Sequence, residues 1–328
     1  MTVENSVSRN RKDAVGDYLR QTLGDNLFCT STGYKHVITA SGREIGSANR
    51  LAEALRAFQE LPESERKPAA VKSGAPGPID QTVVPPPAPR DGLVAKIYGR
   101  MLARNTDGSL RHVHVGDFPL VQGRDDDRAG RVGYLFEAQP DYFWLTKEEA
   151  DALVPAEPRA GQTQRVPEAI TQRICRFHLI PARIYGEGGE WGRSAVRRAE
   201  LALTVTKVSD KRIEMTLAGS AHMGSEYEAA KATTPTGPLG LGYAPTLEGV
   251  LTYDRVNKCF TRFDVVALGD AWGRMGDANG KSVSIERPGR NPLAFSFERV
   301  GPDAPVVDLG LTPAGRASKL KWYFESAK

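Results

Sequence analysis

Hydrophobic and polar positions alternate along several stretches of the chain after residue 92. In residues 201–206 every second side chain is a large apolar one, and residues 212–217 repeat the pattern beyond a short polar turn. A period of two is typical of a β-strand with one buried face and one exposed face. The predicted buried positions of these two strands are Leu201, Leu203, Val205, Ile213, Met215 and Leu217.

Short polar turns connect the predicted strands in pairs. Residues 105–109, 209–211 and 255–258 each separate two apolar stretches, and the first of them contains an Asp-Gly pair, which is typical of hairpins. Residues 293–297 add a strand with the same alternation. Several hairpins of this kind predict an α+β, mainly β fold, in which residues 93–328 form an antiparallel barrel or sandwich.

Two or three helices are expected to interrupt this sheet. Thr146 and Glu149 have the spacing of a capping box, which predicts the first turn of a helix. A second helix is predicted over residues 168–175, because a proline precedes it and suits a helical first turn. Residues 177–180 are predicted as a strand, and residues 319–324 as a last strand or as a strand that docks on another chain.

Residues 1–61 are predicted to form a small α/β segment. Apolar residues follow a helical period at residues 13–23 and 51–58, and residues 27–30 and 36–39 have the composition of short strands. The strand–turn–strand–helix pattern of residues 26–60 resembles the closing half of a thioredoxin-like domain. It contains no Cys-x-x-Cys pair, so the resemblance implies a partial fold of that kind and no redox activity.

Residues 62–92 are rich in proline, with glycine, alanine and serine between the prolines. Such a segment cannot bury enough apolar surface to offset the entropy that it would lose on ordering. Its run of three consecutive prolines favours polyproline II. We therefore expect a semi-rigid linker between a segment of residues 1–61 and a β-rich domain of residues 93–328.

Charge and composition narrow the class of protein. The formal net charge is +4, and basic residues are interleaved with acidic ones, which argues against a nucleic-acid-binding protein. No apolar run approaches the length of a membrane span. The first residues lack the basic start and apolar stretch of a secretory signal. These features predict a soluble, cytoplasmic protein, and a mature exported form whose signal was removed is the alternative.

Two histidines separated by one residue are candidate metal ligands. On a strand, residues i and i+2 point to the same face, so both imidazoles could bind one ion. Imidazole ligands suit copper or zinc, and no other cofactor is indicated. In the alternative interpretation, the neighbouring valines face the core and these histidines are solvated. The predicted ligand set is His112, His114, His178 and His222, with Met223 or Cys175 as a further ligand.

Three other patterns were considered as sites. Cys175 lies close to His178 in sequence, as a nucleophile and its base could, although a buried structural cysteine fits the same pattern. Asp264 with Asp270, and Glu248 with Asp254, are carboxylate pairs that could do acid–base chemistry or be plain surface charges. Aromatic side chains that could line a ligand groove or fill the core are Tyr142, Phe143, Trp144, Trp191, Trp272, Trp322, Tyr323 and Phe324.

These patterns favour a noncatalytic binding or interaction protein, whose β-rich domain binds a small ligand or a protein partner. The rival hypothesis is a copper- or zinc-dependent enzyme, with redox chemistry as one form of it, built around the histidines. A homo-oligomer that forms through an exposed sheet edge is a third hypothesis. Residues 249–274 and 287–290 resemble segments of uncharacterised bacterial proteins, and this resemblance implies no activity.

Overall fold

The computed structural model of the chain divides it into two units, residues 1–85 and 86–328. The division falls inside the proline-rich segment. Each unit is described by itself. The residues that the structure describes are 12–24, 36–39, 43–47, 51–67, 78, 87–89, 91–117, 138–181, 190–233, 240–276, 282–284, 287–304 and 320–325.

The first unit contains short helices and a two-stranded hairpin. The carboxylate of Asp13 accepts a hydrogen bond from the amide of Gly16 (3.0 Å) and so caps the first helix. Leu19 and Leu23 of that helix are buried. The predicted strand at residues 27–30 lies outside the described residues. The elements are α2 (Ala14–Leu23), β1 (His36–Ile38), β2 (Glu44–Ser47), α3 (Leu51–Glu60) and α4 (Glu63–Arg66).

Two features of this unit differ from the prediction. The second strand, β2, which pairs antiparallel with β1, was not among the predicted strands. The ordered part also continues beyond residue 61, because Pro62 starts the one-turn helix α4 with a backbone φ of −52° that suits a helix start. Leu61 is buried, and Glu65 of α4 pairs with Arg43 (2.8 Å). Helix α4 therefore lies inside the segment of residues 62–92 that was predicted as a linker.

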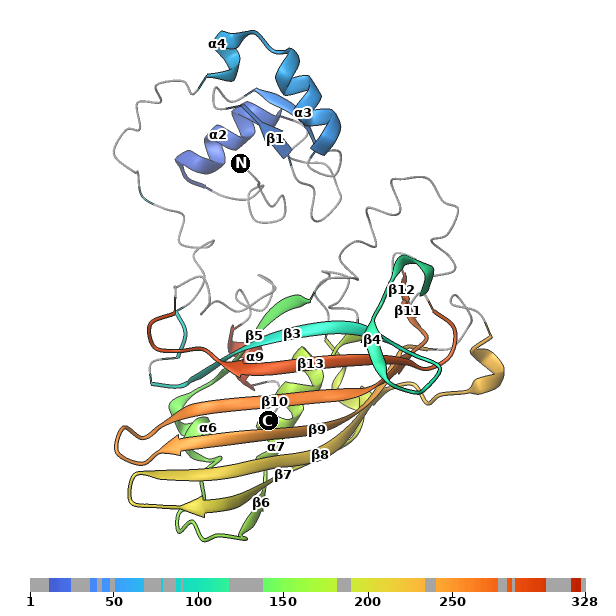
Figure 1. Cartoon of the computed structure of the whole chain (residues 1–328). Helices are drawn as coiled ribbons and strands as arrows, with labels where there is room; N and C mark the ends of the chain where they lie inside the picture. The colour runs from blue at the N-terminus through green and yellow to red at the C-terminus, as the bar shows by residue number, and fades with distance from the viewer. Residues whose placement is uncertain are drawn as a thin grey trace. The chain divides into compact units, whose positions relative to one another are not determined.

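The second unit is built on one large antiparallel sheet. In the described part of the chain the sheet has nine strands: eight follow the order β4-β3-β13-β10-β9-β8-β7-β6, and the ninth, β5, pairs with β3 (Figure 1). A separate hairpin is formed by β11 (Arg274–Gly276) and β12 (Ser282–Ser284). The strands of the large sheet are β3 (Leu93–Arg104), β4 (Leu110–His112), β5 (Gln139–Leu145), β6 (Thr163–Arg165), β7 (Val196–Val208), β8 (Arg212–Gly224), β9 (Gly242–Asp254), β10 (Cys259–Trp272) and β13 (Asn291–Arg299).

This topology confirms the α+β, mainly β class and corrects its finer form. The sheet runs from β6 at one end to β4 and β5 at the other, and these end strands do not pair with each other among the described residues. The domain is therefore a single open sheet, neither a closed barrel nor two sheets packed face to face. The predicted hairpins are present, because β7 pairs with β8 and β9 with β10 around the polar turns.

One face of the sheet carries the hydrophobic core. The predicted positions of β7 and β8 are buried there with the apolar residues of β3, β9, β10 and β13. Helices α6 (Lys147–Asp151) and α7 (Glu168–Arg173) lie against this face, as Figure 1 shows. The remaining described turns are η4 (Val115–Asp117), η6 (Ile174–His178), η8 (Arg193–Ala195) and η9 (Ala229–Lys231).

Two segments predicted as strands are helical. Residues 174–178 continue α7 as a π-helical turn, which the bond from the Leu179 amide to the Ile174 carbonyl (3.1 Å) closes. The C-terminal segment forms α9 (Leu320–Glu325). In a helix, residues 323 and 324 both lie on the same side as residue 320. In a strand, residues 323 and 324 would point to opposite faces. Tyr323 is fully buried in this way.

Glycines on the inner face allow neighbouring strands to approach closely. A Cβ at Gly269 of β10 would lie 2.2 Å from the carbonyl oxygen of Ala244 in β9, and a Cβ at Gly219 of β8 would lie 2.1 Å from that of Glu200 in β7. No side chain fits at these distances. Glycine at such positions allows a sheet to bend and twist around the elements that it covers.

Among the described residues, none of the helices combines the length and the apolar character that crossing a membrane requires.

Candidate functional site

Strand β5 lies at an edge of the sheet, where no strand of the described residues pairs with its outer main-chain groups. It pairs with β3 on one side only. On the other side the amide of Trp144 donates to the hydroxyl of Tyr323 (3.1 Å), and the carbonyl of Trp144 accepts from Arg173 (3.2 Å). Side chains of η6, α7 and α9 thus take the place of a neighbouring strand. An edge covered in this way is protected from pairing with another chain.

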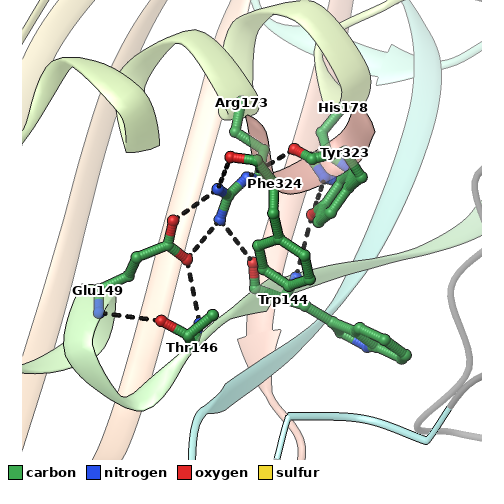
Figure 2. Close-up of polar contacts among 7 residues, drawn as sticks. All are labelled: Trp144, Thr146, Glu149, Arg173, His178, Tyr323 and Phe324. Carbon is green, nitrogen blue, oxygen red and sulfur yellow. Dashed lines mark hydrogen bonds and ion pairs between the residues drawn. The ribbon is translucent and has the colours of Figure 1, made fainter. Parts of the chain in front are cut away.

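The guanidinium of Arg173 lies at the centre of this region and is fully buried. Its terminal nitrogens donate to both carboxylate oxygens of Glu149, each at 2.6 Å. Three longer bonds, of 3.2 to 3.3 Å, go to the main-chain carbonyls of Trp144, Tyr323 and Phe324 (Figure 2). All five N–H donors of the guanidinium are therefore used. Two of them hold carbonyls in the last turn of α9.

Glu149 connects Arg173 to the start of α6. Its amide donates to the Thr146 hydroxyl (3.2 Å), and its carboxylate accepts from the Thr146 amide (3.0 Å), which completes the predicted capping box. The same carboxylate carries the negative charge that balances the buried guanidinium. A buried charge without such a partner would cost several kcal/mol. One side chain thus caps a helix and neutralises the arginine.

His178 lies beside this ion pair and is fully buried on η6. Its Nδ1 is 2.8 Å from a carboxylate oxygen of Asp141, and its Nε2 is 2.8 Å from the hydroxyl of Tyr323. A neutral imidazole protonated on Nδ1 donates to Asp141 and accepts from Tyr323, whose oxygen is left to accept from the Trp144 amide. This arrangement holds the tyrosine by its hydroxyl group.

Aromatic rings complete the contact between α9 and the rest of the domain. The guanidinium of Arg173 lies 5.1 Å from the ring of Tyr323 and 4.6 Å from that of Phe324. Trp322 packs edge-on against Phe177 with 4.8 Å between ring centroids. Contacts between a cation and an aromatic face gain strength when both are shielded from water. We call the residues that receive α9 the α9 docking site: Asp141, Trp144, Glu149, Arg173, Phe177 and His178.

The structure places the predicted metal ligands in different surroundings. His178 uses both ring nitrogens inside the α9 docking site. His222 lies on β8, edge-on to Trp272 at 5.8 Å and near Glu226 at 3.5 Å. His112 lies on β4, and four strands separate β4 from β8 in the sheet, which corresponds to about 24 Å measured along the sheet.

The geometry assumed for the pair of histidines is also incorrect. Strand β4 ends at His112, so His114 does not continue it to the same face. The amide of His114 instead donates to Asp117 (2.7 Å) in the turn η4. Val113 is buried and both histidines are exposed, which agrees with the alternative interpretation. In the described ranges, no group of three or more His, Cys, Asp or Glu side chains could hold a metal ion.

The environment of Cys175 does not suit a nucleophile. Complete burial raises the pKa of this thiol to about 12. The thiolate is therefore almost absent near neutral pH, and the thiolate is the reactive form. His178 is engaged by Asp141 and Tyr323. Cys175 is the buried structural cysteine of the alternative interpretation.

The carboxylates singled out from sequence serve local structure. Asp264 pairs with Arg262 (2.5 Å) on an exposed surface. Asp254 accepts bonds from the amides of Asn257 and Val256 in the hairpin turn, and these bonds lower its pKa. Asp270 binds two arginines. Ion pairing and turn capping therefore account for these three groups.

The tryptophans do not line an open groove. Trp144, Trp191 and Trp272 are at most 5% exposed. The indole nitrogen of Trp191 donates to the carbonyl of Leu179 (2.9 Å), which fixes that ring inside the core. Trp144 instead belongs to the α9 docking site.

Sequence patterns identified some members of this site and missed the most important one. The capping-box spacing pointed to Glu149, and the scarcity of histidine pointed to His178, although in another role. Arg173 carries no local signal, because arginine on a helix is usually exposed. Comparison with protein-family models, curated proteins and solved structures finds no match to this chain.

Proposed function

We propose that this protein is a noncatalytic binding protein, and that its β domain binds a short helical segment containing Tyr followed by Phe at the free edge of β5. The chain's own C-terminal segment, residues 320–325, takes that place in the structure described above. A partner protein with a similar segment, or a second copy of this chain, would bind in the same way. The observation that carries the proposal is the set of five hydrogen bonds made by the buried Arg173.

Recognition of main-chain atoms supports this assignment. Arg173 donates to the carbonyls of Tyr323 and Phe324, which every peptide offers at the end of a helix. A cation is favoured at the C-terminal end of a helix by the helix dipole. The two carbonyls thus provide affinity that does not depend on side chains, and the neighbouring rings add selectivity.

Selectivity for tyrosine follows from the contacts of its hydroxyl. This oxygen lies within hydrogen-bond distance of His178 and of the Trp144 amide. A phenylalanine at position 323 would leave both groups buried without that partner, which costs about 1–3 kcal/mol for each unsatisfied group. Sites built to bind a hydroxyl reject ligands that lack it.

The chain's own segment is an imperfect occupant. The indole nitrogen of Trp144 is buried and has no hydrogen-bond partner among the residues that the structure describes. A buried donor without an acceptor weakens the complex. A partner segment that offers an acceptor at this point would bind more tightly than residues 320–325, which makes exchange favourable.

A peptide-binding experiment on the full chain tests the proposal. A fluorescently labelled peptide of residues 316–328 is titrated with a chain that carries Tyr323→Ala and Phe324→Ala, and its anisotropy is followed. We expect a Kd of about 1–10 μM, in the range of many peptide-binding modules. The unaltered chain should bind at least about tenfold more weakly, because its own segment competes for the site.

Two controls make the outcome specific. Arg173→Met in the same background should weaken binding at least tenfold, whereas Arg262→Met, which removes an exposed arginine of β10 paired with Asp264, should leave it unchanged. A peptide with Phe in place of Tyr323 should bind at least about fivefold more weakly. If circular dichroism shows that the chain with Tyr323→Ala and Phe324→Ala is folded and this chain fails to bind the peptide, the proposed function is wrong.

A further inference from the structure

The turn Arg287–Arg290 holds Arg290 in a fixed position. The side-chain amide of Asn291, which is almost fully buried, lies 3.1 to 3.3 Å from the carbonyls of Arg287, Pro288 and Gly289. Gly289 has a φ of +76°, which glycine adopts without strain. Arg287 donates to the carbonyl of Leu102 in β3 (2.7 Å) and ties the turn to the sheet. The backbone that carries Arg290 is thereby fixed.

The side chain of Arg290 is held by two aromatic rings. Its guanidinium lies 5.4 Å from the ring of Trp272 and 5.5 Å from that of Tyr227. The two rings pack edge-on at 5.6 Å. Trp272 is itself anchored, because its indole nitrogen donates to the carbonyl of Ser225 (3.2 Å). Stacking of this kind orients an arginine before a ligand arrives.

A second arginine lies beside Arg290 and shares its carboxylate partner. Asp270 binds Arg104 of β3 through Oδ1 (3.0 Å) and Arg290 through Oδ2 (3.3 Å). The two guanidinium groups therefore lie next to each other, one at each oxygen of the same group. Their side chains are 52% and 49% exposed, and that of Asp270 is 20% exposed. Both cations are accessible, and the anion is partly covered.

Charge and donor number favour an oxyanion at this position. Two positive charges face one negative charge, which leaves one net positive charge. Each guanidinium has five N–H donors, and in the contacts of the described residues Arg104 donates one hydrogen bond to Asp270 while Arg290 forms an ion pair with it through one nitrogen. The free donors form planar forks, which match the oxygens of phosphate.

We propose that Arg104 and Arg290 bind the phosphate group of a small molecule. Arg290 is held in position by the stacked rings and the fixed turn, and Arg104, at the end of β3, binds the same phosphate. Asp270 holds the two cations together and lowers their affinity for the ligand by its own charge. This site shares no residue with the α9 docking site and does not depend on the proposed function.

Isothermal titration calorimetry of the full chain with inorganic phosphate tests this proposal. In a phosphate-free buffer of low ionic strength, we expect a Kd of about 1 mM. Arg104→Gln and Arg290→Gln should each weaken binding at least about fivefold, because each removes one fork. Asp270→Asn, which keeps the shape and removes the competing charge, should tighten binding about fivefold.

A matched control and a second ligand complete the design. Arg262→Gln removes an exposed arginine of β10, the strand of Asp270, that is also paired with a carboxylate, and should leave phosphate binding unchanged. Adenosine monophosphate distinguishes a free phosphate from one carried by a small molecule. If its affinity equals that of inorganic phosphate, the phosphate group alone is recognised. If its affinity is higher, the rest of the molecule adds contacts. Absence of binding heat in both the unaltered chain and Asp270→Asn, or an equal loss in Arg262→Gln, would overturn the proposal.

Discussion

Burial decides the chemistry of individual side chains in this protein. Glu149 and three main-chain carbonyls accept hydrogen bonds from every donor of the buried Arg173. Cys175 lies in an apolar environment without such partners, so burial keeps its thiol neutral and raises its pKa. On one helical segment, burial is thus matched by polar partners at Arg173 and keeps the thiol neutral at Cys175.

The raised pKa of Cys175 predicts an inert thiol in the native protein. In a chain with Cys29→Ser and Cys259→Ser, Ellman's reagent should modify Cys175 within minutes in 6 M urea and not detectably in the native state at pH 8. The native pKa of about 12 lies above the ordinary value of 9.0, so raising the pH to 10 should accelerate labelling of the unfolded chain only. Rapid native labelling that increases with pH would contradict this assignment.

The pairing of strands in the β domain depends on glycines at positions where two backbones come too close for a side chain. Gly269 of β10 lies against the backbone of β9, and a Cβ there would come within 2.4 Å of the Cα of Pro245 as well as 2.2 Å of the Ala244 oxygen. Backbone atoms cannot move aside as a flexible side chain can. The closeness of β9 and β10 therefore depends on glycine at this position.

Substitution of this glycine should destabilise the domain. We expect Gly269→Ala to lower the free energy of unfolding by about 2–3 kcal/mol, because the added methyl group overpacks the strand pair. Urea denaturation followed by circular dichroism measures the change. Gly192→Ala is the matched control, because a Cβ there would have no atom within 4 Å, and it should change stability by less than about 0.5 kcal/mol. Equal effects of the two substitutions would refute the close-contact argument.

At the scale of the whole molecule, the chain consists of two units joined through a proline-rich segment. The division falls between residues 85 and 86, inside that segment. The β domain has its own hydrophobic core, which extends across the sheet from β5 and β3 to β7. A domain with a separate core can fold without the rest of the chain.

Limited proteolysis tests this division. Trypsin at low concentration should cut first after Lys72 and Arg90, because these residues lie in the proline-rich segment. The bond after Lys67 should resist, since Pro68 follows it. Mass spectrometry should then identify a resistant fragment that begins at Ser73 or Asp91 and ends at or near residue 328. Early cuts within β7 to β10 would be inconsistent with a separately folded β domain.

The sequence alone determined the class of the fold, the hairpins of the large sheet, the first turn of α6 and the proline-rich connection. These features depend on local patterns: a period of two, a turn composition, a capping spacing. Only the tertiary structure decided that the sheet stays open, that residues 320–325 form a helix, and that Arg173 and His178 hold that helix. Those contacts join residues about 150 positions apart. A local sequence pattern cannot predict which distant side chain will contact a buried charge.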